Sequence, residues 1–142
     1  MALIETGIRT VANRMPKVIT PKAHAIIDYA IAGSFFLMGA LFWRRNKRAA
    51  VASMALGAAK TATAMMTDYP GGISPVISFE THGKIDAGMA GMIGLVPTLL
   101  VFGGESEAMF FRGQAVATAA VTAMTDFEAG SSEKPRRGRR AA

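Results

Sequence analysis

The stretch TPKAHAIID, residues 20–28, decides the fold, because a matching stretch, SFETHGKID, occupies residues 78–86. The match places His82 58 residues after His24, with no gap between the two stretches. The same shift relates three further pairs: Asp28 and Asp86, Thr67 and Thr125, and Asp68 and Asp126. A regular internal match of this kind predicts a tandem repeat, in which each half carries one His-x3-Asp and one Thr-Asp.

Four apolar stretches are long enough to consider as membrane spans: residues 25–43, 49–66, 85–102 and 108–125. A helix of about 19 residues is roughly 28 Å long, which is close to the thickness of a bilayer core. The first stretch carries one charge, Asp28, and has no polar face. A soluble four-helix bundle is the rival interpretation, and the missing polar face argues against it. We therefore expect an all-α integral membrane four-helix bundle.

The composition also favours a membrane protein. Hydrophobic residues make up 51% of the chain and charged residues only 18%, below the quarter that is usual in soluble domains. The net charge of +6 gathers near the two ends and in the turn at 44–48, instead of along one face of a domain. This distribution argues against specific nucleic-acid binding. The absence of cysteine excludes disulfides and thiolate metal sites.

The repeat predicts two helical hairpins in the same orientation, residues 20–72 and residues 73–130. The segment before them, residues 1–19, has the spacing of an amphipathic helix at the membrane interface. Packing of that helix on the bundle is the alternative. The segment after them, residues 131–142, is rich in Gly, Ser and Arg, and we expect a disordered basic tail that contacts anionic lipid headgroups.

The distribution of Lys and Arg predicts the orientation. Two hairpins place both termini and the link between hairpins on one side of the bilayer. That side carries ten Lys and Arg residues, whereas the turns on the other side carry five. The positive-inside rule therefore favours a multi-pass protein of the inner membrane with cytoplasmic termini. The dense basic turn at 44–48 argues in the opposite direction.

The repeated polar residues form the candidate site. Two hairpins in one orientation bring all of them to the same end of the bundle. Asp68 and Asp126 end helices there, where the helix macrodipole disfavours an anion, so partners are expected. The predicted polar cluster consists of His24, Asp28, Thr67, Asp68, His82, Asp86, Thr125 and Asp126.

Three interpretations of this cluster remain open. In the first, each histidine ties its own helix to the aspartate that ends the paired helix, as a structural clasp. In the second, the cluster binds protons or a divalent cation such as Zn²⁺, Mn²⁺ or Fe²⁺. The ligands would then be His24, His82, Asp28, Asp86, Asp68 and Asp126. In the third, His24 and His82 ligate one haem.

No phosphate-binding loop or nucleophile motif is present, so the sequence favours a non-enzymatic protein. We expect a structural or accessory membrane component without a cofactor, which assembles with itself or with a larger membrane complex. Binding or transport of protons or a divalent cation is the alternative, and haem binding is a third. For Lys60 we expect snorkelling towards the membrane interface, with an ion pair to an aspartate as the alternative.

Overall fold

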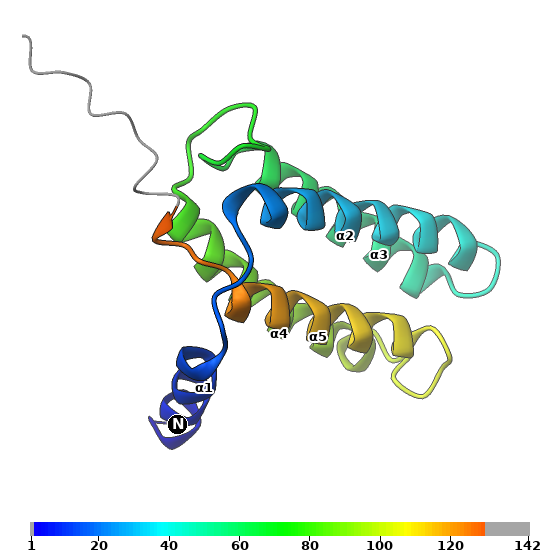
Figure 1. Ribbon diagram of the computed structural model, residues 1–142. Coiled ribbons are helices and arrows are strands. Elements are labelled where there is room, and N and C mark those ends of the chain that lie inside the picture. Colours follow the sequence, from blue (N-terminus) through cyan, green and yellow to red (C-terminus); the bar gives the residue numbers. More distant parts are fainter. Residues whose placement is uncertain (1, 130–142) are drawn as a thin grey trace, which may run out of the picture.

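The computed structural model describes residues 2–129, and they form five helices (Figure 1). The helices are α1 (Ala2–Arg14), α2 (Pro21–Phe42), α3 (Lys47–Met65), α4 (Phe79–Leu99) and α5 (Ala108–Met124). These residues contain no β-sheet, only two isolated bridges, which join Ile19 to Thr125 and Thr67 to Ile77. The all-helical prediction is confirmed for this part of the chain. The basic tail predicted at 131–142 lies outside the described residues.

Helices α2 and α4 begin before their apolar stretches, each at a capping residue. The Thr20 hydroxyl accepts a hydrogen bond from the amide of Ala23 at 3.2 Å, and Pro21 takes the first helical position. The Ser78 hydroxyl accepts the equivalent bond from the amide of Thr81 at 3.1 Å. Each helix begins directly after its capping residue and not at the first apolar residue. Both histidines therefore lie in the first turns of their helices.

Helix α4 ends earlier than the apolar stretch 85–102 predicted. Its last residue is Leu99, and the amide of Phe102 donates back to the carbonyl of Pro97 at 2.8 Å. Val101 adopts a φ of 57°, the left-handed conformation that commonly follows a helix end. The Arg48 guanidinium donates to the carbonyls of Leu100 and Val101 at 3.1 and 2.8 Å, so the first hairpin supports this strained residue.

Small residues allow the helices of the first hairpin to approach closely. A Cβ added at Gly57 would lie 3.2 Å from the Cβ of Phe35, and the Ser53 hydroxyl donates to the carbonyl of Phe35 at 2.7 Å. Helices α4 and α5 form the second hairpin, and Figure 1 shows both hairpins side by side with their turns at the same end. The polar residues of α2 and α4 therefore meet at the opposite end.

Aromatic packing and the two turns hold the hairpins together away from that end. The ring of Phe35 in α2 lies 5.3 Å from Phe110 and 6.2 Å from Phe111, both in α5. At the turns, Asn46 donates to the carboxylate of Glu105 at 2.7 Å, and Arg48 contacts the same carboxylate at 3.0 Å. Contacts in the middle of the bundle and at the turns thus fix the relative position of the hairpins independently of the polar residues at the other end.

The helices of the bundle differ in their suitability as membrane spans. Among the described helices, α2 alone is long and apolar enough to cross a membrane, judged by length and composition. Helix α4 carries three charges in its first half, and α5 is 17 residues long. Helix α1 is present where an amphipathic helix was expected and extends away from the bundle in Figure 1. Its binding to a membrane interface stays a prediction.

Candidate functional site

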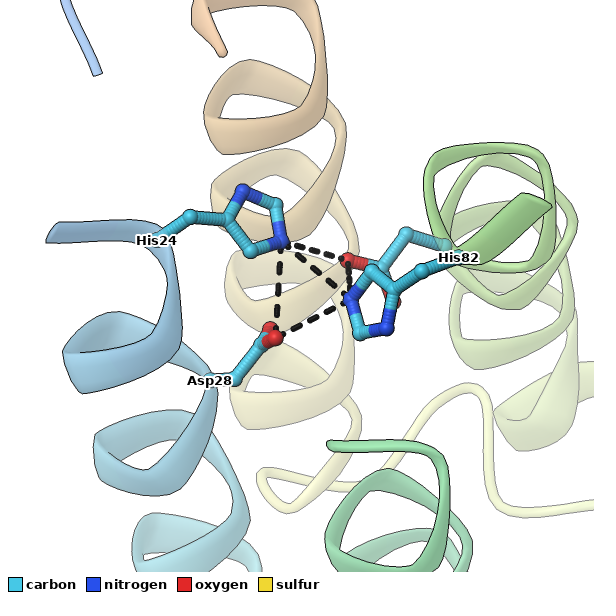
Figure 2. A group of neighbouring side chains, drawn as sticks. His24, Asp28 and His82 are labelled. Atoms are coloured by element: carbon cyan, nitrogen blue, oxygen red, sulfur yellow. Dashed lines mark hydrogen bonds and ion pairs between the residues drawn. The ribbon is translucent and has the colours of Figure 1, made fainter. Parts of the chain in front are cut away.

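Four titratable side chains converge between the hairpins. His24 and Asp28 come from α2, and His82 and Asp86 come from α4. Each lies four residues from its partner, so that the two side chains share one helix face. All four are at most 1% exposed, and one ligand atom from each lies within 4.8 Å of the others. Figure 2 shows His24, Asp28 and His82 pointing toward one another. We call these four residues the His2Asp2 group.

The distances within the His2Asp2 group are short and nearly equal. The two Nε2 atoms are 3.3 Å apart. His24 Nε2 lies 3.4 Å from Asp28 Oδ2 and 3.3 Å from Asp86 Oδ2. His82 Nε2 lies 3.0 Å from Asp28 Oδ2 and 3.2 Å from Asp86 Oδ2. Each imidazole therefore faces both carboxylates, including the one on the other hairpin.

Two threonines orient the imidazoles. The Thr67 hydroxyl donates to the carbonyl of Thr63 at 2.6 Å, and its oxygen lies 2.7 Å from Nδ1 of His82. The Thr125 hydroxyl likewise donates to the carbonyl of Val121 at 2.6 Å and lies 2.7 Å from Nδ1 of His24. Because each hydroxyl hydrogen goes to a carbonyl, each threonine oxygen accepts from an Nδ1–H. Both Nε2 atoms are then left to act as ligands at the centre.

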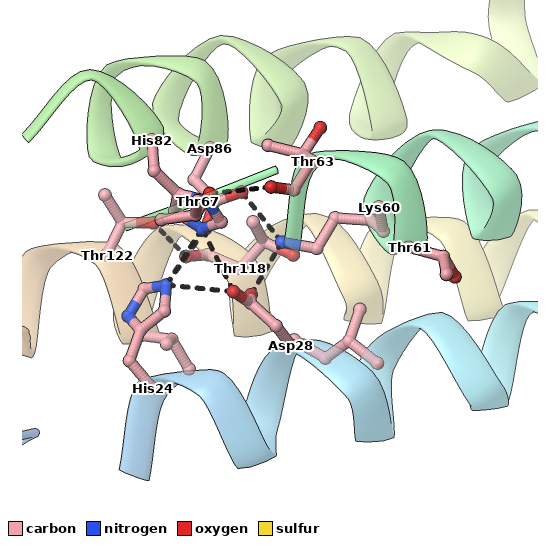
Figure 3. A network of polar contacts seen from close by, with 12 residues as sticks. His24, Asp28, Lys60, Thr61, Thr63, Thr67, His82, Asp86, Thr118 and Thr122 are labelled. Carbon is pink, nitrogen blue, oxygen red and sulfur yellow. Dashed lines mark hydrogen bonds and ion pairs between the residues drawn. The ribbon is translucent and has the colours of Figure 1, made fainter. Parts of the chain in front are cut away.

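Lys60 joins the two carboxylates on the side away from the imidazoles. Its Nζ lies 2.9 Å from Asp28 Oδ1 and 2.7 Å from Asp86 Oδ1, and the side chain is 1% exposed (Figure 3). Each carboxylate thus presents Oδ2 to the histidines and Oδ1 to the ammonium. The expectation that Lys60 snorkels to the interface is wrong, and the alternative, an ion pair with aspartate, is confirmed.

Aromatic residues from the helix ends cover the His2Asp2 group. Tyr69 donates to Asp28 Oδ2 at 3.0 Å, and its ring lies 5.4 Å from that of His82. Burial, together with the negative charge of Asp28, raises the pKa of the Tyr69 hydroxyl, so the hydroxyl remains a donor at neutral pH. Phe79 packs on His24 at 5.3 Å and on Phe127 at 4.8 Å. This cover separates the group from solvent.

The two halves differ at two positions around the group. The 58-residue shift places Thr118 opposite Lys60 and Phe127 opposite Tyr69. Thr118 is 1% exposed, and its hydroxyl oxygen has no hydrogen-bond partner among the described residues. The first half therefore supplies both the ammonium and the phenol of the network, and the second half supplies neither.

The structure brings together six of the eight predicted residues and separates two. Asp68 is exposed, and Asp126 Oδ1 accepts from the amides of Glu128 and Ala129 at 3.1 Å each. Neither aspartate belongs to the His2Asp2 group. Each histidine contacts a threonine of the other hairpin, whereas the predicted clasp pairs it with the aspartate that ends the paired helix. Helices α3 and α5 end before these aspartates, at Met65 and Met124.

Sequence reasoning named Lys60 but did not place it in the cluster, because the second half has no matching lysine. The signal that could have found it is spacing. Lys60 lies seven residues, or about two helical turns, before Thr67 at the polar end of the bundle, and Asp28 lies about two turns into its helix from the same end. Antiparallel helices in one hairpin then bring Lys60 to the level of Asp28.

Comparison of the chain with protein-family models, with curated proteins and with solved structures gave no match.

Proposed function

We propose that this protein binds one divalent transition-metal ion, with Zn²⁺ the best fit, at the His2Asp2 group. The observation that carries the proposal is the set of five distances of 3.0–3.4 Å among the four ligand atoms. Ligands at roughly 2.0–2.1 Å from a tetrahedral Zn²⁺ lie about 3.3 Å from one another. Four atoms that all carry lone pairs repel at these distances unless a metal ion or a shared proton lies between them.

The chemistry of the ligands narrows the choice of ion. Imidazole and carboxylate suit Zn²⁺, Mn²⁺ and Fe²⁺, whereas Cu⁺ prefers sulfur ligands. Four protein ligands in a buried group make a closed site, which is typical of structural zinc and not of catalytic zinc. Haem fits poorly, because a macrocycle would have to enter between imidazoles whose Nε2 atoms are 3.3 Å apart and share two carboxylates.

A metal ion at the His2Asp2 group would join the two hairpins, because its ligands come from both of them. Two ligands come from α2 and two from α4, and the threonine that orients each histidine lies on the other hairpin. The site is at the end of the bundle that the turns do not hold. A non-enzymatic role in a small membrane component therefore agrees with the closed geometry.

The membrane setting is part of the proposal, and exposed apolar side chains support it. Large apolar side chains on the outer faces of three helices are more than half exposed. They include Leu37, Leu41, Leu95, Leu99, Met109 and Val116. Monomeric soluble proteins rarely expose large contiguous apolar patches, and lipid would cover these side chains. Helices α2 to α5 contain 22, 19, 21 and 17 residues, so a tilted bundle with a locally thinned bilayer accommodates all four.

A shared proton is the second candidate for the same site. The 3.3 Å separation between the two Nε2 atoms is also within reach of an N–H···N hydrogen bond. One proton held between the imidazoles would balance the remaining negative charge of two carboxylates and one ammonium. In that case the cluster is a metal-free polar clasp between hairpins.

Metal analysis of the protein purified in detergent tests the proposal. We expect one equivalent of bound metal, and on replacement by Co²⁺ the intense visible absorption of a tetrahedral ion. Asp86→Asn should abolish both signals, because it removes a ligand charge. Asp126→Asn is the matched control, since Asp126 caps local amides outside the group, and it should retain them. Absence of bound metal together with no Co²⁺ absorption would favour the shared proton instead.

Reporter fusions test the membrane topology. A reporter after Ala142 should report the cytoplasm, and a reporter inserted in the turn at 44–48 should report the opposite side. Reporters on the same side at both positions would exclude the paired-hairpin arrangement in the membrane.

A further inference from the structure

Lys60 holds a position that a second metal ion would otherwise take. In two-metal carboxylate centres of helical bundles, each bridging carboxylate gives one oxygen to each ion. Here Asp28 and Asp86 both give Oδ2 to the histidine side, while both Oδ1 atoms contact one Nζ at 2.9 and 2.7 Å. The ammonium therefore lies in the bridging position, with a covalent tether to α3.

The second half of the chain has a threonine at the position equivalent to Lys60. Thr118 occupies the place in α5 that Lys60 occupies in α3, and Figure 3 shows it beside the network. Its buried hydroxyl has no partner among the described residues. A lysine introduced at position 118 should therefore place its ammonium near the same two carboxylates, from the second hairpin.

Charge decides what this arrangement does to metal binding. With neutral imidazoles, two carboxylates and one ammonium leave the cluster at −1, and a divalent ion takes it to +1. Without the ammonium, the cluster starts at −2 and a divalent ion neutralises it. A buried group with net charge is costly, so the ammonium both supports the metal-free fold and opposes metal binding.

We propose that Lys60 is a built-in second cation that restricts the site to one divalent ion and lowers the affinity for that ion, an inference that rests on the proposed metal site. Removal of the ammonium should bind the ion more tightly. For the single charge of the ammonium and the double charge of the ion about 5 Å apart, at an effective dielectric constant near 20, the gain in affinity has an upper limit on the order of 10⁵-fold. The metal-free protein should lose stability at the same time, because two unpaired carboxylates remain buried.

Thermal denaturation in detergent, with Zn²⁺ or with a chelator, tests the inference. Wild type should unfold at a higher temperature with Zn²⁺ than with chelator. Lys60→Met, which keeps the length and removes the charge, should show a larger difference between the two conditions and at least a tenfold tighter Zn²⁺ affinity. The double variant Lys60→Thr with Thr118→Lys moves the ammonium across the bundle and should return both values towards wild type.

Each other outcome overturns the inference in a distinguishable way. An equal or smaller Zn²⁺ effect in Lys60→Met would show that Lys60 is a structural tie only, while the metal site stands. Failure of Lys60→Met to fold even with Zn²⁺ would lead to the same conclusion, as would a double variant that behaves like Lys60→Met. Two ions bound to wild type would contradict the single-ion site. No Zn²⁺ effect and no bound metal in wild type would remove the proposed function itself.

Discussion

His24 and His82 are 58 residues apart in the chain, yet their Nε2 atoms lie 3.3 Å apart in the fold. Each contacts both Asp28 and Asp86, so the two histidines share all of their acidic partners. The halves of the chain therefore do not build two separate polar contacts. They build one, and neither half completes it alone.

Substitution of the two histidines should be non-additive. His24→Ala and His82→Ala should each reduce the free energy of unfolding by about 1–3 kcal/mol, because each leaves buried partners unsatisfied. The double variant should lose less than the sum by more than about 0.5 kcal/mol, since the first change already disrupts the shared group. Denaturation in detergent of wild type, both single variants and the double variant measures this. Additive losses would instead support the interpretation, drawn from the sequence, that each histidine forms an independent clasp.

Removal of the Thr67 hydroxyl should weaken the site without touching a ligand. Thr67→Val keeps the shape but leaves the Nδ1–H of His82 without its acceptor, at a cost of about 1–3 kcal/mol. Metal affinity should fall by roughly 10- to 100-fold, as expected for loss of a residue that orients a ligand. Titration with Zn²⁺ in detergent checks the affinity. Thr67→Ser retains the hydroxyl and should remain close to wild type; equal weakening by both variants would contradict this role.

Alkaline pH should destabilise the protein through Tyr69. Its folded pKa lies above its ordinary value of about 10. The contribution of the protonated hydroxyl is therefore complete below that value, and is lost as the pH rises above it. In Tyr29→Phe, which leaves Tyr69 as the only tyrosine, tyrosinate absorbance should appear together with loss of helical circular dichroism. Ionisation near pH 10 with the helices intact would show that the phenol is not held by Asp28.

Gly72 should tolerate no side chain. A Cβ at this position would overlap the carbonyl oxygen of Thr67, and that backbone carries the side chain that orients His82. Gly72→Ala should destabilise the fold by about 1–3 kcal/mol and weaken metal binding. Gly88→Ala is the matched control, since no atom of another described element lies within 4 Å of the added Cβ. That control should be neutral or stabilising by up to about 1 kcal/mol, as is usual for glycine in a helix.

The apolar stretches predicted the helices, and the internal match predicted six of the residues that meet, because both follow from local spacing. The capping residues Thr20 and Ser78 place each histidine and aspartate on one helix face. Which hairpin supplies each threonine could not be predicted in the same way. It depends on the lateral arrangement of the hairpins, and aromatic packing such as that of Phe35 on Phe111 determines that arrangement.

The aspartates that end the helices show a second limit of the sequence. Asp68 and Asp126 match across the repeat as well as Asp28 and Asp86 do, yet neither joins the His2Asp2 group. A match records that two positions are equivalent, and it does not record which way their side chains point. Lys60 shows the converse, because it breaks the match and yet contacts both carboxylates.

That break makes the halves non-interchangeable. Two copies of the first half would bring two lysines and two tyrosines against one pair of carboxylates, and two copies of the second half would bring neither. Only one copy of each gives the carboxylates a single ammonium. A chain cut in the link between α3 and α4 should therefore reassemble as a pair of unlike pieces, because two second halves would leave both carboxylates without an ammonium and two first halves would crowd two lysines into the position that one occupies.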